Sequence, residues 1–404
     1  MHLPTALLMK NPIQGYDWGS PDALTRLFGI PNPDSKPQAE LWMGAHANGC
    51  SLVEVGGLPV RLSELIAGRP LAMLGESTAT RFGALPFLFK VLCAEKALSI
   101  QVHPSKAQAE AGFAREEGAG IAVDAPHRNY RDDNHKPELV FALTPYQAMN
   151  GFREFGAILA LFERVAAASL VPLVEAFHAN PDEQGLARFF RALLTLNGEP
   201  KESALAALRA YAECHRHDET FALVLSLFDQ YPGDVGLFAP LLLNVVTLQP
   251  GQAMYLDACT PHAYVHGTGL EIMANSDNVL RAGLTAKHLD VDELLACTRC
   301  QPKLADELLL SPRLAGATQH FDVPVPDFTF SVYVAGTHEL TTSSAEILFA
   351  INGTLSLHCD GQPALVLARG QSAFLPACIG PYEVQAQGSF ARAGNRGSRR
   401  LWRR

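Results

Sequence analysis

The sequence predicts a mainly β fold with a helical insertion. From Leu52 to about Met149 the apolar runs are short, rich in β-forming residues and interrupted by Gly and Pro, as in the strands of a sandwich or barrel. From Phe155 to about Tyr231 the chain is instead rich in Ala and Leu, with apolar positions three and four apart, which is the period of a helix. Strand character resumes at residues 243–248. Because strands and helices do not alternate, a doubly wound parallel sheet is not expected.

The helical insertion is expected to contain more than one helix. Its apolar pattern is broken at Asn180-Pro181 and again at Gly198-Glu199-Pro200. Pro and Gly end helices, because Pro lacks a backbone N–H and Gly adopts the turn conformations that follow a helix. The helices therefore form an insertion in an otherwise all-β chain.

Two segments of the chain repeat one another. Residues 251–265 align without gaps with residues 370–384, and Gly, Gln, Leu, Ala, Cys and Val match. Both copies have the turn-strand-turn-strand order of a small double-sheet jelly roll. His262 of the first copy corresponds to Pro381 of the second, and Pro cannot bind a metal. The first copy is therefore the candidate for chemistry, and the second is expected to serve packing or to shape a pocket.

Length and composition predict a globular protein of two or three domains, since 404 residues exceed one ordinary domain. The chain is 48% hydrophobic and 18% charged, and its formal net charge is −9. That sign argues against nucleic-acid binding over most of the surface. A sugar phosphate would need a local basic cluster against the overall charge.

The eight cysteines are scattered along the chain, which is typical of reduced thiols in a cytosolic protein. Cys297 and Cys300 form a C-x-x-C pair, but no second pair supports a zinc site there. The N-terminus has no cleavage-type signal, and no run of about twenty apolar residues exists. Neither export nor membrane insertion is indicated, and a cytoplasmic location is expected.

An amide and an imidazole stand where one apolar strand ends. Gln101 and His103 are two residues apart and point the same way on a strand. With Glu138 and His262 they can offer one carboxylate, two imidazoles and one amide to a single divalent metal. One anionic ligand leaves such a site near +1, so it attracts an incoming oxygen. The ligand types suit Zn, Mn, Co or Fe, and affinity order alone does not choose among them.

Residues 134–138 add candidates for proton transfer. Pro137 favours extended geometry at Lys136, and a lysine near a metal in a desolvated pocket can act as a general base. His135 can be a partner of a metal ligand or a proton carrier. The alternative interpretation of both is an ordinary surface residue.

Residues 271–287 are rich in functional groups for a segment flanked by apolar strand. Arg281 and Lys287 can recognise phosphate, one as a planar fork and the other as a point charge. The alternative is an Asx-rich turn with surface charges. Lys90 lies inside an apolar run, where a lysine is expected to need a partner.

Several motifs, taken together, resemble type I mannose-6-phosphate isomerases. These motifs are Leu98-Ser99-Ile100-Gln101-Val102-His103-Pro104, Asn134-His135-Lys136-Pro137-Glu138, Pro261-His262-Ala263-Tyr264 and residues 275–285, with Tyr16-Asp17-Trp18-Gly19 and residues 40–44 upstream. They cover nearly the whole chain in the family's order, except the segment after about Gly388. The resemblance implies a zinc-dependent cupin enzyme, with one zinc per chain, that interconverts mannose 6-phosphate and fructose 6-phosphate through an enediol.

The resemblance also implies roles for single residues. The metal ligands fall on Gln101, His103, Glu138 and His262, and the active-site arginine falls on Arg281. Ser99 and Lys106 match positions near the phosphate site. Further pocket positions are Trp18, Glu40, Lys90, Lys136, Glu271, Asp277 and Lys287. We expect Lys136 or Glu271 to shuttle the proton, with His135 in reserve.

The expected organisation is a discontinuous catalytic cupin domain (residues 1–151 and 238–310), a helical insertion (152–237) and a C-terminal jelly-roll domain (311–404) that ends in a basic tail. No nucleotidyltransferase-like signature precedes the cupin part, which argues against the bifunctional type II enzyme. The expected partner is a small sugar phosphate, with no nucleic acid or membrane, and the chain is expected to be a monomer or weak homo-oligomer in carbohydrate metabolism, including GDP-mannose biosynthesis. Two alternatives are an iron cupin oxygenase and a non-catalytic carbohydrate-binding jelly roll.

Overall fold

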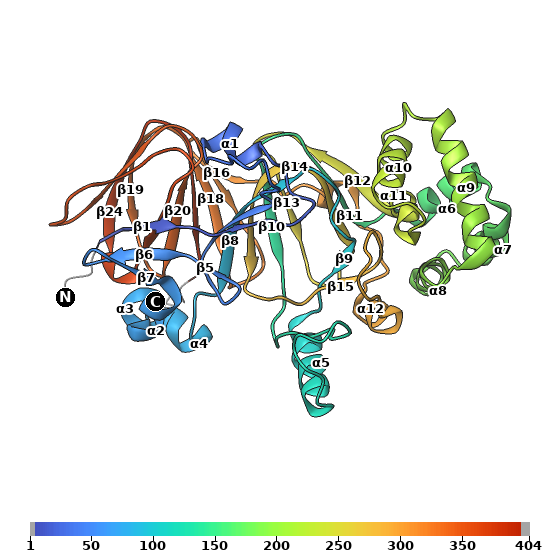
Figure 1. Cartoon of the computed structure of the whole chain (residues 1–404), viewed down its shortest axis with the longest axis horizontal. Helices are drawn as coiled ribbons and strands as arrows, with labels where there is room; N and C mark the ends of the chain where they lie inside the picture. Colours follow the sequence, from blue (N-terminus) through green and yellow to red (C-terminus); the bar gives the residue numbers. More distant parts are fainter. Residues whose placement is uncertain (1–4, 397–404) are drawn as a thin grey trace, which may run out of the picture.

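The computed structural model describes residues 5–396. Two β portions lie side by side and a group of helices lies at one end of the molecule (Figure 1). The predicted mainly β fold with a helical insertion is confirmed. Of the predicted basic tail, residues 397–404 lie outside the described residues.

The first β portion is a ten-stranded antiparallel sheet that bends into an open barrel around the candidate metal ligands. Its main path runs in the order β12-β11-β14-β8-β3-β2, while β10 joins β14 to β13 and β9 joins β14 to β15. The strands are β2 (Ile13–Gln14), β3 (Glu40–Met43), β8 (Phe87–Ala94), β9 (Gln101–Val102), β10 (Glu138–Ala142), β11 (Tyr146–Phe152), β12 (Leu243–Leu248), β13 (Ala253–Leu256), β14 (His262–Ala274) and β15 (Leu280–Arg281).

The second β portion pairs a nine-stranded sheet with a four-stranded one. The nine-stranded sheet has β16 (Arg313–Ala315), β17 (Thr318–Phe321), β18 (Thr329–Tyr333), β25 (Phe390–Gly394), β20 (Glu346–Ala350), β23 (Ser372–Leu375), β1 (Leu7–Lys10), β6 (Leu52–Val55) and β7 (Leu58–Arg61), in that order. The other sheet has β19 (Gly336–Thr341), β24 (Pro381–Ala386), β21 (Leu355–Cys359) and β22 (Leu365–Leu367). Strands from the first 61 residues thus belong to both β portions, and a small hairpin is formed by β4 (Ala45–His46) and β5 (Gly49–Cys50). The division into domains stays a prediction.

The two β portions share one apolar core. It is built from inward-facing residues of β3, β8, β10 and β14 on one side and of β17, β18, β20 and β25 on the other. Aromatic rings meet across it: the ring centroids of Phe89 and Phe330 are 6.0 Å apart, and those of Phe141 and Phe321 are 5.7 Å apart. Such burial of large rings holds the two portions together.

The insertion consists of α6 (Phe155–Val165), α7 (Val171–Ala179), α8 (Glu183–Leu194), α9 (Gly198–Cys214), α10 (Glu219–Gln230) and α11 (Ala239–Leu242). The predicted breaks fall where one helix ends and the next begins. Asn180-Pro181 separates α7 from α8, where the Asp182 carboxylate accepts a hydrogen bond from the Gly185 N–H and so begins the new helix. Gly198 opens α9, with Pro200 in its first turn.

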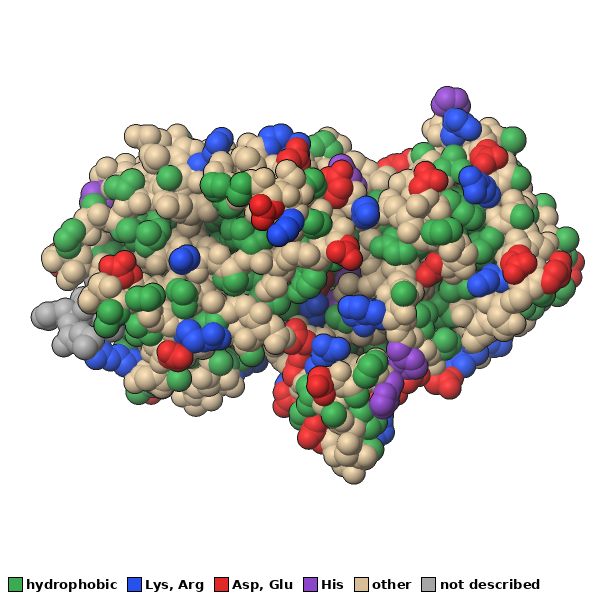
Figure 2. Space-filling model, viewed as in Figure 1, with side chains coloured by type: hydrophobic (Ala, Val, Ile, Leu, Met, Phe, Trp, Pro, Cys, Tyr) green, Lys and Arg blue, Asp and Glu red, His purple; other side chains and the backbone are tan. Residues whose placement is uncertain are grey.

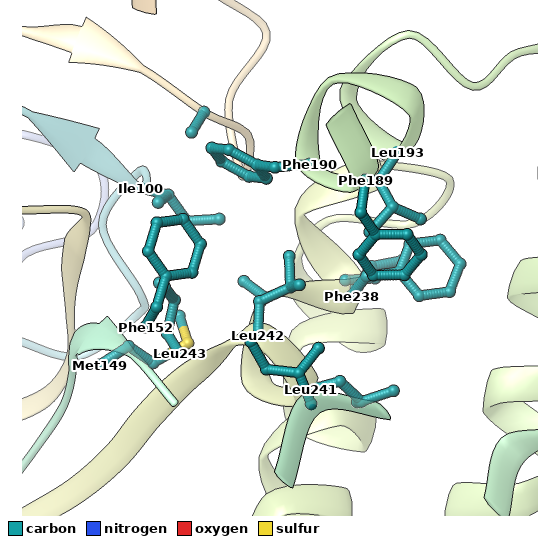
Figure 3. Close-up of a cluster of buried hydrophobic side chains, with 14 of the residues drawn as sticks. Ile100, Met149, Phe152, Phe189, Phe190, Leu193, Phe238, Leu241, Leu242 and Leu243 are labelled. Carbon is teal, nitrogen blue, oxygen red and sulfur yellow. The ribbon is translucent and has the colours of Figure 1, made fainter. Parts of the chain in front are cut away.

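The helices pack on the end of the first sheet. Ile100, which precedes β9, and Phe152 of β11 lie in one buried cluster with Phe190 and Leu242 of the insertion (Figure 3). This packing anchors the short β9, which has only two residues and carries Gln101. The insertion therefore supports the strand from which the candidate metal site is built.

The remaining helices are α1 (Ala23–Phe28), α2 (Leu62–Gly68), α3 (Pro70–Leu74), α4 (Glu76–Phe82), α5 (Lys106–Gly118) and α12 (Val291–Cys297), with short 3-10 turns at Ala168–Leu170, Val235–Phe238, Ala305–Glu307 and Ala377–Ile379. Within residues 5–396, none of the helices has both the length and the apolar character needed to cross a bilayer.

The sequence repeat is also a repeat of hydrogen bonds. Gly251 and Gly370 both have positive φ, 91° and 81°, which glycine adopts without strain. The side-chain oxygen of Gln252 accepts from the Gln249 N–H at 2.8 Å, and that of Gln371 accepts from the Ala368 N–H at 2.8 Å. Each turn leads into an equivalent strand, β13 or β23, as the repeat predicted.

Candidate metal centre and active site

Strand pairing brings the four predicted metal ligands together. Gln101 of β9 lies opposite His262, the first residue of β14. Glu138 is the first residue of β10 and lies opposite Met273, near the other end of β14. His103 directly follows β9. The ligands come from segments up to 161 positions apart, and the register of the short β9 on β14 aligns them.

The two imidazoles face one carboxylate. The Nε2 atom of His103 lies 3.3 Å from one oxygen of Glu138, and the Nε2 atom of His262 lies 3.4 Å from the other. All three side chains are buried, and one ligand atom from each lies within 4.8 Å of the others. No other group of three or more His, Cys, Asp or Glu in the part of the chain described here has this geometry.

Hydrogen bonds fix which nitrogen of each histidine is free. The Nδ1 atom of His103 donates to the Asn278 carbonyl at 2.8 Å, and that of His262 donates to the Thr260 carbonyl at 2.9 Å. Each Nε2 therefore carries a lone pair toward Glu138, the arrangement found in metal-binding histidines. The Nε2 atom of His103 is buried without a hydrogen-bond partner, which a metal would supply.

Burial sets the charge of these ligands. It lowers the pKa of His103 to about 4, so that the imidazole is neutral at pH 7. Burial alone would raise the pKa of Glu138, but Lys136 and His103 outweigh it and hold that pKa well below its usual range. A buried carboxylate with two imidazoles is a donor set suited to a divalent cation.

Gln101 lies at the same centre. It lines, with Glu138 and His262, a small cavity of about 50 Å³, and its amide lies 3.4 Å from the Ser99 hydroxyl. Lys136 lines the cavity too, with its ammonium 3.3 Å from Glu138. The residues present thus fit a metal with the predicted amide as a further ligand.

A buried charged network lies behind this centre. The Lys90 ammonium lies 3.0 Å from Glu271 and 3.7 Å from Glu40. The Tyr264 hydroxyl bridges Glu271, at 2.8 Å, and the metal-side Glu138, at 3.0 Å. Burial disfavours the Lys90 charge, yet the two carboxylates raise its pKa above the usual value. Lys90 is therefore the expected partnered lysine.

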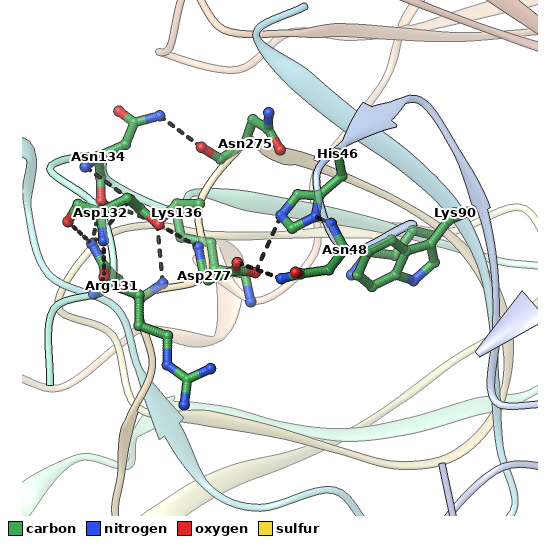
Figure 4. A network of polar contacts seen from close by, with 12 residues as sticks. His46, Asn48, Lys90, Arg131, Asp132, Asn134, Lys136, Asn275 and Asp277 are labelled. Atoms are coloured by element: carbon green, nitrogen blue, oxygen red, sulfur yellow. Dashed lines mark hydrogen bonds and ion pairs between the residues drawn. The ribbon is translucent and has the colours of Figure 1, made fainter. Parts of the chain in front are cut away.

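The small cavity opens into a larger one of about 520 Å³, because Glu40, Lys90, Ser99, Gln101 and Lys136 line both. The predicted pocket residues Trp18, Asp277, Arg281 and Lys287 also line the larger cavity. Asp277 is held by the His46 ring at 3.2 Å and the Asn48 amide at 3.0 Å (Figure 4). In Figure 2, Lys and Arg side chains gather at a hollow near the middle of the face, beside β9 and β15.

Among the Lys and Arg side chains that line the larger cavity, Arg131, Arg281 and Lys287 stand apart from the ion pairs described above. None of them forms an ion pair with a carboxylate of residues 5–396. Burial, and then the charge of Arg131, lowers the pKa of Arg281, while burial followed by both arginines lowers that of Lys287. Like charges held together without a counter-ion define a site for an anion.

Arg131 was not among the predicted residues. It stands just before the motif at residues 134–138, and Figure 4 shows its side chain extending away from the polar network that holds its backbone. The Arg131 N–H donates to the Asn278 side chain at 2.7 Å, and Asp132 accepts from the Asp277 N–H at 2.7 Å. The sequence signal that could have identified Arg131 was its position three residues before the motif at residues 134–138.

Two predicted residues lie elsewhere. Lys106 begins α5, where its ammonium donates to the Asp133 carbonyl at 2.8 Å, and it lines neither cavity. The His135 ring lies 3.1 Å from Asp327 in the loop before β18, and it also lines neither cavity. The Ser105 capping box directs α5 outward, and the Asp327 carboxylate draws the His135 ring toward the second β portion.

A buried His-Glu-His centre inside an antiparallel barrel, opening on a cavity lined by unpaired cations, defines a metal-binding barrel protein that accepts an anionic ligand. Family comparison agrees and is more specific. Models of the type I phosphomannose isomerase catalytic domain, of its helical insertion domain and of the mannose-6-phosphate isomerase cupin domain match residues 7–155, 162–243 and 317–395. The chain belongs to the type I phosphomannose isomerase family.

Individual relatives extend over nearly the whole chain. The mannose-6-phosphate isomerase of Salmonella typhimurium is 50% identical over 389 residues, which covers 96% of this chain and 98% of that protein. That of Homo sapiens is 34% identical over 410 residues, covering 93% and 95%. The family resemblance expected from the motifs is confirmed.

Solved structures show the same fold. A single-residue variant of phosphomannose isomerase from Salmonella typhimurium superposes with a TM-score of 0.93 at 49% identity, covering 97% of this chain and 99% of that one. A zinc-bound mannose 6-phosphate isomerase gives a TM-score of 0.92 at 49% identity, with the same coverage. The comparisons give no support to an oxygenase or to a non-catalytic carbohydrate-binding jelly roll.

Proposed function

We propose that this chain is a zinc-dependent isomerase that interconverts mannose 6-phosphate and fructose 6-phosphate. The observation that carries the proposal is the position of the His103-Glu138-His262 centre, which opens directly onto a cavity with three unpaired cations. The family supports the substrate, since the named relatives are mannose-6-phosphate isomerases. Gln101, His103, Glu138 and His262 would hold the zinc, which when bound supplies Lewis-acid polarisation of the sugar oxygens.

Arg131, Arg281 and Lys287 bind the substrate phosphate in this proposal. A phosphate carries the charge that the three cations lack, and the arginines offer the planar fork that matches its oxygens. With the phosphate held at the open end, the C1–C2 end of the sugar extends toward Lys136 and Gln101. The cations thus orient the substrate as well as bind it.

The reaction moves a proton between neighbouring carbons. A base removes the proton from C2 of the open-chain aldose, and the C2–H electron pair forms the C1–C2 double bond of an enediol while the C1 oxygen takes up a proton. The C2 hydroxyl then loses its proton to become the ketone, the double bond takes the carried proton at C1, and the hydroxyl proton given up at O2 balances the one gained at O1. Lys136 is our proposed carrier, because it lines both cavities beside Glu138. Glu271 is the second candidate, because it lines only the small cavity. It also accepts a hydrogen bond from the Tyr264 hydroxyl and forms an ion pair with Lys90. His135, paired with Asp327, is the least favoured.

The test is a coupled isomerase assay on chelator-treated protein, repeated after zinc is added back. Loss of turnover on chelation and recovery with zinc are expected. Deuterium at C2 of mannose 6-phosphate should slow turnover, because the C2–H bond breaks. Full activity in the chelated protein would contradict the zinc proposal.

The cellular setting is also proposed. Cysteines such as Cys93, Cys297 and Cys300 are free thiols, which supports a reducing compartment such as the cytoplasm. A monomer or weak homo-oligomer remains our proposal for the oligomeric state, and sedimentation of the purified chain at two concentrations tests it.

A further inference from the structure

The second β portion repeats the first strand by strand. The order β2-β3-β8-β14-β10-β13 in the first corresponds to β16-β17-β18-β25-β20-β23 in the second, and all pairs are antiparallel. Glu138 lies opposite Leu256, and Glu346 lies opposite Leu375, its counterpart in the sequence repeat. Glu346 therefore occupies the position of the metal-binding glutamate.

The same registers show what replaces the rest of the centre. Glu271 lies opposite Val140, two residues beyond Glu138, and Arg392 lies opposite Leu348, two residues beyond Glu346. Arg392 thus takes the position of Glu271, while Pro381 takes that of His262. The barrel has exchanged a carboxylate and an imidazole for a guanidinium and a proline.

This exchange neutralises the buried Glu346 without a metal. The guanidinium of Arg392 contacts both Glu346 oxygens, at 2.5 and 2.8 Å, and the Tyr382 hydroxyl donates to the same carboxylate at 2.7 Å. The second barrel therefore keeps a polar interior, and Glu346, already paired with Arg392, is not available as a ligand for a cation.

The mouth of this barrel is a cavity of about 900 Å³, with Glu346 and Arg392 in its wall. Arg313 lies 3.1 Å and Arg396 3.7 Å from the single carboxylate of Asp322, so two guanidiniums share one negative charge. His320 bonds through Nδ1 to the Ser331 hydroxyl at 2.8 Å, which leaves Nε2 for a ligand. The charged side chains in the cavity wall are three guanidiniums, of Arg313, Arg392 and Arg396, against two carboxylates, of Asp322 and Glu346, so positive charge is in excess.

We propose that this cavity is a second binding site, for a small phosphate-bearing anion. Arg313 and Arg396 each have guanidinium nitrogens beyond those that contact Asp322, and such nitrogens bind phosphate oxygens in pairs. His320 and Ser331 add polar contacts deeper in the cavity. The ligand can be free phosphate or a sugar phosphate, and the proposal does not depend on the isomerase reaction.

The test uses zinc-depleted full-length chain and titration calorimetry at low ionic strength. The first cavity is silenced by Arg131→Ala with Arg281→Ala, and inorganic phosphate and mannose 6-phosphate are the two probes. One phosphate-binding site should remain. Tighter binding of mannose 6-phosphate than of phosphate assigns the site to sugar phosphates, and equal or weaker binding assigns it to free phosphate.

In the silenced chain, Arg313→Ala should weaken that remaining site about tenfold or more, since charge-assisted hydrogen bonds are lost. Arg369→Ala is the matched control: it removes the same charge from an exposed turn of the same barrel, outside the cavity. No binding in the silenced chain overturns the proposal, as does equal weakening by the two substitutions. Arg313→Ala added to the otherwise unaltered chain should keep full isomerase turnover, which shows that its fold is intact.

Discussion

Lys136 is the residue on which the proposed proton transfer depends. Its ammonium lies 3.3 Å from Glu138 and it lines both cavities. Lys136→Ala should lower kcat by about 10²–10⁴-fold, the range of a positioned general base. Steady-state kinetics on zinc-loaded protein measure this, and Lys96→Ala, which changes an exposed lysine just after β8, is the control. Unchanged kcat would pass the role to Glu271.

Arg131 tests whether the unpaired cations recognise phosphate. Arg131→Ala should raise KM for mannose 6-phosphate about ten- to hundredfold, because charge-assisted hydrogen bonds contribute about 1.5–3 kcal/mol. Arg131→Lys should recover part of this loss, since it restores the charge without the fork. The control is Arg188→Ala, an exposed arginine of α8. An unchanged KM would mean that Arg131 only shapes the cavity.

His103 gives the zinc-free chain a pH dependence. Burial lowers its pKa to about 4 in the folded chain, against 6.5 in the unfolded one, so the unfolded state binds more protons between these values. The contribution of His103 to the free energy of unfolding should be fully present above pH 6.5 and should be lost as the pH drops toward 4. Urea unfolding of chelated protein at several pH values measures it. His103→Asn should unfold with a smaller loss over this window, and an identical loss would contradict this origin.

The metal ligands could be predicted from the sequence because each lies in a local motif whose residue types suit a metal. Arg281 and Lys287 could also be predicted, from the segment at residues 271–287. Arg131 could not, since it becomes their neighbour only when the Asn278 side chain joins the two loops. Lys106 illustrates the opposite case. A local motif placed it near the site, whereas the direction of α5 and the Asp133 carbonyl decide where its ammonium lies.

Among the strands, β14 places residues of both the metal centre and the buried charged network. The strand runs from His262 to Ala274 and changes partners along its length, pairing with β9 and β11 at one end and with β8 and β10 at the other. Gly267 lies at the change, with φ +124°. One strand can thus deliver His262 to the metal centre and Glu271 to the buried network.

Gly267→Ala should therefore destabilise the protein more than a positive φ alone explains. An added Cβ would lie 2.5 Å from the Pro145 carbonyl oxygen, so crowding of about 1–3 kcal/mol adds to roughly 1–2 kcal/mol of backbone strain. Gly251→Ala is the matched control, because that glycine has φ +91° and nothing within 4 Å of the new Cβ. Chemical denaturation measures both, and equal losses would contradict the crowding.

The helical insertion was visible in the sequence through its period and its breaks, because local propensity and helix capping decide them. That the strands of the first 61 residues divide between two sheets could not be predicted from the sequence. That outcome depends on pairing between β1 and β23, whose strands give similar local patterns whichever sheet they join.

For the whole molecule, bound zinc should stabilise the folded state, because its proposed ligands lie on β10 and β14 and on or directly after β9. A ligand present at about 100 times its Kd adds about 2.7 kcal/mol to the free energy of unfolding when only the folded state binds it. Zinc added to chelated protein should raise Tm, and Glu138→Gln should remove most of that rise. Thermal unfolding followed by circular dichroism measures both. An equal rise in the variant would place the stabilising zinc elsewhere.

The pairing of Leu7 with Phe374 also bears on how the chain is made. During synthesis β1 leaves the ribosome first, yet its partner β23 emerges only when most of the chain is complete. Contacts this distant in sequence form slowly and leave strand edges open to other chains in the meantime. Early pairing of β1 with β6, which is close in sequence, covers one edge of β1 before β23 has been synthesised to cover the other edge.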